Sequence, residues 1–419
     1  MHTLAQLRSG ELQGIKRLKI SESLSNFPEE IYTLSETLEI LDLSNNALSE
    51  IPSEISRLKK LKIAFFSNNC FKEVPSAFKS CENLSMLGMK SNQIEDFDED
   101  ILPLSISWLI LTDNQIKVLP KSIGKLHKLQ KCALAGNQIR LIPEEIEGCR
   151  NLELLRLSAN QIERLPLSLL KLPKLSWLAF SGNPCALIHQ ECSLPSTVSK
   201  DLEFQERLGE GASGEIFKGY SKVLQKEVAI KLFKGAVTSD GYARDEMMAY
   251  MNTGNHKNLI RVLAKIEEED RLGLLLELIP ERYGNLGLPP DFDTCTRDTF
   301  EEGKTFSIES IATISKAIAS AAAHLHKKNI MHGDLYAHNI LIDQENSCYL
   351  GDFGAASFYV EDSDIYEKIE VRAFGCLLDD LLGLCEQKEH LLYQNIKKLS
   401  EQCMDSNIEK RPVFSEILF

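Results

Sequence analysis

The chain of 419 residues is longer than one ordinary hydrophobic core accommodates, so we expect two or three domains. Its hydrophobic content of 43% and charged content of 26% are typical of a globular protein and argue against intrinsic disorder. The net charge of −14 argues against a protein that binds nucleic acid or an anionic membrane over a broad basic surface.

The eleven cysteines are scattered without CxxC pairs, and several, such as Cys132 and Cys149, fall at positions expected to be buried. This distribution predicts reduced thiols in a cytoplasmic protein rather than a disulfide framework or a metal site. The N-terminal segment has no continuous apolar stretch, and no run of about 18 apolar residues occurs anywhere. We therefore expect neither a signal peptide nor a membrane span.

The first part of the chain repeats itself about every 23 residues. Each copy contains the pattern L-x-x-L-x-L-x-x-N, as in "LELLRLSAN" at 152–160, and then a segment such as "LPKSIGKL" at 119–126. An earlier, weaker copy has Ser23 in place of the asparagine. The repeated asparagines are Asn46, Asn69, Asn92, Asn114, Asn137, Asn160 and Asn183.

This pattern resembles short leucine-rich repeats, with about eight copies over 1–185. In an α/β solenoid of this kind the leucines point inward from short strands, so that stacked copies share one core. The asparagine is expected to satisfy backbone groups that stacking would otherwise bury unpaired. Proline followed by acidic residues, as in "IPEEI" at 142–146, is expected to start a short helical turn.

The variable positions of each predicted strand are expected to line the concave face on which such repeats bind partners. These positions are unusually apolar, and both tryptophans of the chain are among them. Large exposed apolar patches mark interaction sites, so we expect a protein partner or substrate here. The alternative is that these side chains cover one another or contact the second domain. The residues proposed for the partner contact are Phe65, Trp108, Ile110, Leu154 and Trp177.

After the repeats we expect a cap or linker over 186–203, because Pro184 breaks the pattern. From Phe204 a predicted strand, a glycine-rich turn with the spacing G-x-G-x-x-G and a second strand lead to a third strand that ends in Lys231. Glycines allow backbone amides to approach phosphate groups. A dinucleotide-binding turn has the same spacing but leads into a helix, whereas strand-forming residues follow here. Glu246, in the next predicted helix, is placed to pair with Lys231.

Two further motifs are "HGDLYAHNIL" at 332–341 and "GDFG" at 351–354. Together with the glycine-rich turn and "VAIK", they make 204–419 resemble a eukaryotic-type protein kinase domain. The resemblance implies a bilobal α+β fold, with an N-lobe over about 204–279 and a C-lobe over about 280–419.

The resemblance also implies a phosphotransferase that uses ATP and Mg²⁺. Asp334 would orient and deprotonate the accepting hydroxyl, with Lys231 and Glu246 completing the catalytic set. Asn339 and Asp352 would hold Mg²⁺, which prefers hard oxygen ligands. The implied nucleotide-binding residues are Gly209, Gly211, Gly214, Ile216, Ala229, Lys231, Glu277, Leu278 and Leu341.

Several departures from the family pattern bear on regulation and substrate choice. Gly333 replaces the arginine that usually receives an activation-loop phosphate, so we predict that hydroxyls of that loop are dispensable as switches. Glu370, which stands at the aspartate of the family's central helix, lies only 18 positions after Asp352, and no A-P-E motif lies between them. In the family, the arginine at the position of Arg411 pairs with the glutamate of A-P-E. Because that motif is absent here, Arg411 lacks an obvious partner in the sequence. His338 stands at the tyrosine-kinase-like place between the catalytic aspartate and asparagine.

The favoured interpretation is a cytoplasmic protein kinase whose repeats recruit a protein substrate or regulator, with serine or threonine as the expected acceptor and tyrosine as an alternative. A pseudokinase scaffold is a second hypothesis, which the complete motif set argues against and the short activation segment argues for. A third is a small-molecule phosphotransferase of the aminoglycoside or choline kinase type, whose catalytic loop is similar. The sequence leaves the oligomeric state, the partner and the acceptor open.

Overall fold

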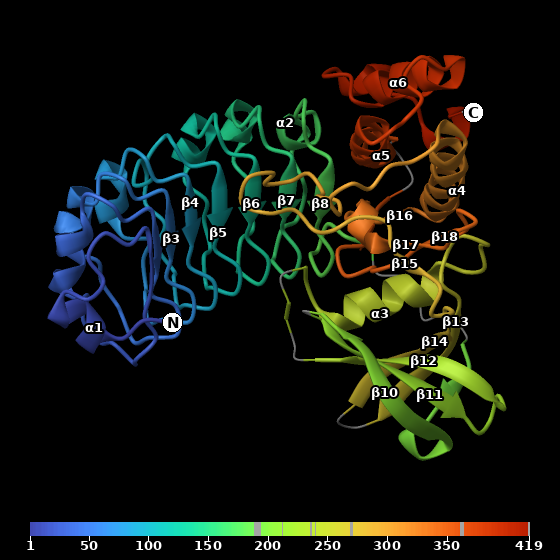
Figure 1. Cartoon of the computed structure of the whole chain (residues 1–419), viewed down its shortest axis with the longest axis horizontal. Coiled ribbons are helices and arrows are strands. Elements are labelled where there is room, and N and C mark those ends of the chain that lie inside the picture. The colour runs from blue at the N-terminus through green and yellow to red at the C-terminus, as the bar shows by residue number, and fades with distance from the viewer. Residues whose placement is uncertain are drawn as a thin grey trace. The chain divides into compact units, whose positions relative to one another are not determined.

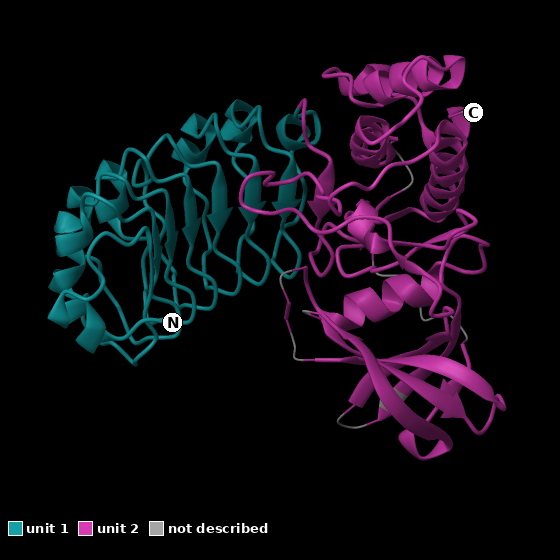
Figure 2. Ribbon diagram, in the orientation of Figure 1, with its two compact units in different colours: residues 1–172 teal, residues 173–419 magenta. Residues whose placement is uncertain are grey.

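The chain folds into two compact units, residues 1–172 and residues 173–419 (Figure 2). This division falls 13 residues before the boundary expected at residue 185, so the strand of the eighth copy belongs to the second unit. The computed structural model describes residues 1–187, 194–211, 213–234, 237–238, 240–268, 271–360 and 364–417.

The first unit contains seven short parallel strands that pair one after another in direct register (Figure 1). Arg17, for example, lies opposite Ile40, and Ile40 lies opposite Ile63. The middle residue of each strand points into the core and is buried. The strands are β1 (Arg17–Lys19), β2 (Ile40–Asp42), β3 (Ile63–Phe65), β4 (Met86–Gly88), β5 (Trp108–Ile110), β6 (Lys131–Ala133) and β7 (Leu154–Arg156).

Short helices alternate with these strands. Prolines precede most of them, as expected, because proline fixes a backbone angle compatible with helix initiation. The fifth 3₁₀ helix also has Glu144 and Glu145 in its first turn, where carboxylates are favourable. The helices are α1 (Leu4–Ser9), η1 (Glu29–Leu34), η2 (Ser53–Arg57), η3 (Ser76–Ser80), η4 (Lys121–Lys125), η5 (Glu144–Gly148) and α2 (Leu167–Leu170).

The repeated asparagines form a buried ladder of hydrogen bonds between neighbouring copies. Asn69 is representative: its Nδ2 donates to the carbonyl oxygens of Leu43 and Phe66 at 3.0 and 3.1 Å. Its Oδ1 accepts from the backbone N–H of Leu48 at 2.9 Å. The role predicted for these side chains is confirmed in the first unit, where the repeated asparagines satisfy backbone groups of two copies that stacking removes from water.

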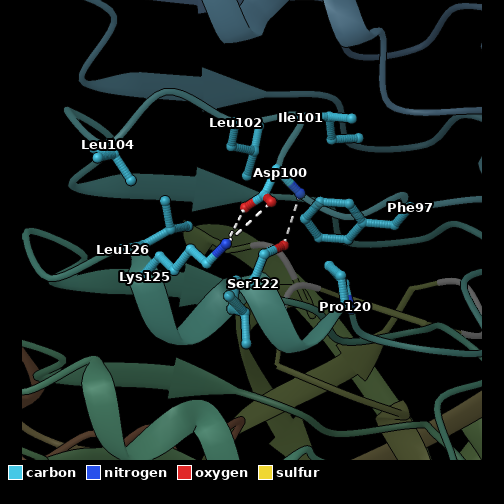
Figure 3. A pocket seen from close by; sticks show the side chains of 10 residues that line it. Phe97, Asp100, Ile101, Leu102, Leu104, Pro120, Ser122, Lys125 and Leu126 are labelled. Carbon is cyan, nitrogen blue, oxygen red and sulfur yellow. Dashed lines mark hydrogen bonds and ion pairs between the residues drawn. The ribbon is translucent and has the colours of Figure 1, made fainter.

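One copy of the repeat is irregular. The asparagines Asn92 and Asn114 are one residue closer together than the others, and no helix lies between β4 and β5 in this fully described stretch. Polar contacts to the next copy take the helix's place: Asp100 Oδ1 pairs with Lys125 Nζ at 2.7 Å, and the Asp100 N–H donates to Ser122 Oγ at 2.9 Å (Figure 3). A small hollow remains beside them, lined by Phe97, Ile101, Leu102, Leu104, Pro120 and Leu126 (Figure 3).

The second unit begins with the strand of the eighth copy, β8 (Trp177–Ala179), and continues into a six-stranded sheet of order β10-β11-β12-β14-β13-β9. The strand β9, which lies in the expected linker, pairs in parallel with β13, whereas the other pairings are antiparallel. The elements of this lobe are β9 (Ser196–Thr197), η6 (Ser199–Asp201), β10 (Leu202–Glu210), β11 (Gly214–Ser221), β12 (Lys226–Phe233), α3 (Ala243–Asn252), β13 (Val262–Glu268) and β14 (Arg271–Glu277).

The remainder of the second unit is mainly helical and carries two small sheets, of order β15-β17-β18 and β16-β19. The strand and helix types therefore match the expected bilobal α+β fold. No helix in the described part of the chain is long and apolar enough to cross a membrane. The elements are β15 (Gly284–Asn285), α4 (Ile308–His326), β16 (Ile330–Met331), η7 (Ala337–Asn339), β17 (Ile340–Ile342), β18 (Cys348–Leu350), β19 (Ser357–Phe358), α5 (Ile365–Gly383), α6 (Leu391–Cys403), η8 (Ile408–Lys410) and η9 (Phe414–Glu416).

Candidate active site

The glycine-rich turn joins β10 to β11, and its glycines have different surroundings. A Cβ on Gly214 would lie 2.2 Å from the carbonyl oxygen of Leu232, so the pairing of β11 with β12 requires a glycine there. A Cβ on Gly209 or Gly211 would meet no atom of another described residue within 4 Å, chain neighbours apart. Because the fold itself does not demand these two glycines, the open space beside them suits a ligand that approaches the backbone closely.

A buried ion pair joins the sheet to the helix beside it. Lys231, near the end of β12, pairs with Glu246 of α3, and both side chains are almost fully buried. Burial favours the neutral amine, but Tyr250, Glu246 and Asp352 outweigh it and raise the pKa of Lys231 above its ordinary value. The lysine is therefore held as a cation in a fixed position, which is the state that attracts phosphate oxygens.

The residues expected to flank the nucleotide base come from three strands and the segment after β14. Ala229 is buried on β12 opposite Leu276, and Ile216 lies opposite Lys231 on β11. Leu278 directly follows β14, which ends at Glu277, and Leu341 lies in β17; both leucines are half-buried. The role of these residues in nucleotide binding stays a prediction.

The catalytic loop follows β16 and places two predicted residues in contact. Asn339 Nδ2 donates to both the backbone oxygen and Oδ2 of Asp334, each at 2.9 Å. These bonds fix the orientation of the Asp334 carboxylate and use the amide nitrogen of Asn339, not its amide oxygen. His332 Nδ1 accepts from the Asp334 N–H at 3.3 Å, and His332 Nε2 lies 2.9 Å from the carbonyl oxygen of Gly351. The histidine therefore joins the catalytic loop to the "GDFG" segment.

Within that segment Asp352 and Phe353 have opposite environments. Asp352 has a positive φ of 57°, an uncommon conformation for a residue with a side chain, and is exposed. Phe353 is fully buried, and its ring contacts the rings of His332 and Tyr250 at centroid distances of 4.9 and 4.7 Å. Packing of the phenylalanine thus fixes the backbone that presents the Asp352 carboxylate.

Glu370 holds the catalytic loop from inside the helical lobe. Its carboxylate accepts hydrogen bonds from the backbone N–H groups of His332 at 3.1 Å and Gly333 at 2.6 Å, and it lies 2.8 Å from His326 Nε2. Burial opposes ionisation, but the hydrogen bond and charge of His326, with those of the loop, outweigh it and lower the pKa of Glu370. A longer glutamate therefore occupies the position of the family's aspartate.

Arg411 has backbone carbonyls as partners. Its guanidinium donates to the carbonyl oxygens of Asp405, Lys368 and Pro173 at 2.8, 3.2 and 2.8 Å. Burial among neutral groups and beside Arg372 lowers the pKa of Arg411 to about 10. The partner left open by the sequence is thus the peptide backbone, including that of the eighth repeat copy.

Two contacts of the catalytic loop were not anticipated from the sequence. His338 Nδ1 lies 2.7 Å from Asp298 Oδ1, and the rings of His338 and Tyr336 stack with centroids 4.9 Å apart. The Trp177 ring also stacks on the Tyr336 ring, with 4.4 Å between the two ring centroids. The one available signal was the pair Tyr336 and His338 in "DLYAHN", which does not reveal distant partners.

The apolar face predicted for partner binding is less exposed than expected. Phe65 and Ile110 are half-buried, whereas Trp108 and Leu154 are buried. Lys131 Nζ lies 4.3 Å from the centroid of the Trp108 ring, so the neighbouring copy contributes to covering it.

The prediction that Trp177 is available to a partner is wrong. Its side chain is 1% exposed and stacks on Tyr336 within the same unit. Its indole N–H donates to the backbone oxygen of Leu335 at 3.1 Å. Both the ring and its polar group are therefore engaged by the catalytic loop, as in the alternative that assigned this face to the chain's own second domain.

Comparison with known families supports the family resemblance of both the repeats and the C-terminal domain. The model of the protein kinase domain matches residues 202–374, and the leucine rich repeat model matches residues 36–94 and 105–162. The chain thus carries leucine-rich repeats followed by a protein kinase domain.

Individual relatives resemble the chain over part of its length. The angiopoietin-1 receptor of Danio rerio is 24% identical over 291 residues, covering 56% of this chain and 25% of that protein. Serine/threonine-protein kinase 1 of Arabidopsis thaliana is 28% identical over 172 residues, covering 39% of this chain and 19% of that protein. Tyrosine-protein kinase FRK of Homo sapiens is 30% identical over 168 residues, covering 40% and 31%. The chain spans less than a third of these relatives, and their names include both serine/threonine and tyrosine kinases.

Proposed function

We propose that the chain is an ATP- and Mg²⁺-dependent protein kinase that transfers the γ-phosphoryl group of ATP to a protein hydroxyl. The observation that carries the proposal is that the residues expected to bind the nucleotide and those of the catalytic loop are both held in place by neighbouring side chains. Lys231 is held as a cation by Glu246, and Asn339 orients Asp334. A domain that only scaffolds other proteins has no requirement for either arrangement.

The residues present fit a magnesium ion. Asp352 offers an exposed carboxylate and Asn339 an amide oxygen, and Mg²⁺ prefers oxygen ligands. Among the described residues no group of three or more His, Cys, Asp or Glu side chains is placed to hold a metal on its own. That fits an ion bound by one or two protein side chains together with phosphate oxygens. Such an ion would neutralise negative charge that develops during phosphoryl transfer.

The chain's own groups supply the remaining functions. The open backbone at Gly209 and Gly211 would admit the phosphates, and the Lys231 ammonium would bind their oxygens. Asp334, oriented by Asn339, would accept the proton of the attacking hydroxyl. Because positioning and charge stabilisation dominate phosphoryl transfer, a rigid loop matters more here than a strong base.

The repeats would recruit a protein substrate or regulator through the face that contains Phe65, Trp108, Ile110 and Leu154. Two of these side chains remain half-buried and present apolar surface that a partner could cover. A cytoplasmic setting is consistent with the cysteines, because every cysteine in the described ranges is a free thiol.

The proposal is tested with the purified full chain, γ-labelled ATP and Mg²⁺. Label should appear on the protein itself or on peptides that contain serine, threonine or tyrosine, and EDTA should abolish transfer. Asp334→Asn should lower the rate about 10³-fold while Mg-ATP still binds, because the substitution removes the proton acceptor and retains its shape. Mg-ATP binding without transfer to any peptide would favour the scaffold. Transfer only to an aminoglycoside or to choline would favour the small-molecule alternative.

A further inference from the structure

The eighth copy of the repeat, Pro173–Asn183, contacts the catalytic loop through a side chain. The indole ring of Trp177 lies almost parallel to the Tyr336 ring, with an interplanar angle of 6° and centroids 4.4 Å apart. The Trp177 Nε1–H donates to the Leu335 carbonyl oxygen at 3.1 Å. Leu335 and Tyr336 directly follow Asp334, so the tryptophan fixes the backbone next to the catalytic carboxylate.

The backbone of the eighth copy occupies the space beside Gly333. A Cβ on this glycine would lie 2.7 Å from the carbonyl oxygen of Leu178 and 2.6 Å from that of Ala355. The residue also has a positive φ of 73°, which favours glycine. An arginine at this position is therefore incompatible with the eighth copy, and the departure from the kinase pattern is explained by the strand that lies there.

The eighth copy is also anchored to the helical lobe near the short activation segment. Arg411 donates to the Pro173 carbonyl oxygen at 2.8 Å, and Arg372 donates to Ser176 Oγ at 2.6 Å. The N–H of Phe180 donates to Ser357 Oγ at 2.8 Å. The arginine whose usual glutamate partner is missing thus binds the repeat, and the short segment itself binds the same strand.

The turn of the eighth copy reaches the helix that carries Glu246. A Cβ on Gly182 would lie 2.7 Å from Asp245 Oδ2 and 2.8 Å from the ring of Tyr242. These two residues stand at the start of α3, and Glu246 follows Asp245 immediately. One repeat copy therefore contacts both the catalytic loop and the helix that positions Lys231.

We propose that the eighth repeat copy replaces the missing part of the activation segment, holding the catalytic loop and the start of α3 in place, with Trp177 as a positioning residue. The mechanistic consequence rests on the proposed phosphoryl transfer. In many kinases this arrangement forms only when the activation loop becomes phosphorylated and ordered. Here covalent continuity between the repeat and the kinase domain supplies the ordering contacts permanently.

The test uses the full chain with Trp177→Ala, the conservative Trp177→Phe, and Leu111→Ala as a control. Leu111 is fully buried in a regular copy of the first unit, so its truncation destabilises a repeat without contacting the catalytic loop. Each variant is measured for kcat, for KM of ATP, and for hydrogen exchange of the amides in 333–339. Trp177→Ala should lower kcat about 10- to 100-fold and accelerate exchange in the loop, because misplacement of a catalytic group by about 1 Å costs rate. The KM of ATP should change less than about two-fold, because the nucleotide-side residues are untouched.

Trp177→Phe retains the ring stack and should recover most of the lost rate, whereas Leu111→Ala should lower the melting temperature with kcat and loop exchange unchanged. The inference is overturned if Trp177→Ala keeps the wild-type kcat and loop protection, or if Leu111→Ala reduces both equally. A wild-type chain that transfers no phosphoryl group would overturn the proposed function alone. Loop exchange would still decide the inference in that case, since faster exchange in Trp177→Ala alone supports it and unchanged exchange contradicts it.

Discussion

The seven repeat copies of the first unit and the eighth copy in the second share a sequence pattern, a three-residue strand and the same turn conformation. The residue before the repeated asparagine has a positive φ in both regions: 55° at Ala159 in the seventh copy and 68° at Gly182 in the eighth. Their neighbours differ. The Trp108 ring meets the Lys131 ammonium of the next copy, whereas the Trp177 ring meets Tyr336 of the catalytic loop.

The difference shows that the repeat pattern specifies the backbone and the inward core, while the variable positions decide what each copy contacts. In the first unit those contacts serve stacking, so a substitution there should change stability or partner binding but leave the rate of phosphoryl transfer unchanged. In the eighth copy the same positions contact catalytic elements, so a substitution of equal size should also change the rate.

Among substitutions at the contacts of the eighth copy, the largest effect is expected at Gly333. Gly333→Ala places a Cβ within 2.7 Å of two carbonyl oxygens and requires a positive φ, which costs about 1–2 kcal/mol even without the contacts. The strand of the eighth copy or the catalytic loop must then move. We expect phosphoryl transfer to fall about 100-fold, measured as kcat with labelled ATP. Wild-type turnover of a folded Gly333→Ala protein would show that the close approach of Leu178 has no catalytic role.

A smaller effect is expected from Gly182→Ala, with Gly136→Ala as its matched control. Both glycines precede the repeated asparagine and have φ of 68° and 69°. Ala159 adopts this conformation in the copy after Gly136, so Gly136→Ala should cost only about 1 kcal/mol of unfolding free energy and leave kcat unchanged. At Gly182 the added Cβ meets Tyr242 and Asp245, so α3 must shift.

We expect Gly182→Ala to lower kcat about 10-fold, through the position of Glu246 relative to Lys231. The two variants are compared by kcat and by chemical denaturation. Equal kcat values in the two variants would remove the distinction between the regions at this turn.

Much of the fold and part of the candidate site could be predicted from the sequence. The rest could not, for a physical reason. The repeat spacing predicts each strand because a stacked core demands apolar residues at fixed places, as at Leu18 and Leu41. The pairing of Lys231 with Glu246 was predictable because the ordered kinase motifs place both residues. These are local or family-wide constraints.

Contacts between distant segments were not predictable in the same way. Trp177 and Tyr336 are 159 positions apart, and no spacing rule relates a repeat strand to a catalytic loop. Gly333 and Arg411, whose usual glutamate partner is missing, were visible as departures, yet the strand that explains both was assigned to the concave face. The repeat pattern continues into the second unit, so the sequence carries no signal of the division at residue 172.

The central claim is that contacts with the eighth repeat copy order the catalytic loop and the start of α3 without phosphorylation of the activation segment. The hydroxyls of the short segment fit this claim, since Ser357 and Tyr359 are buried and bonded to neighbouring groups and Tyr366 packs against Phe180; Ser363 lies outside the described residues. The most direct test is the phosphoryl-transfer rate of the full chain before and after phosphatase treatment, with complete dephosphorylation verified by mass spectrometry. We predict that the rate changes less than about two-fold, because no phosphate-dependent anchor is needed. A rate that falls ten-fold or more and returns on rephosphorylation would contradict the claim.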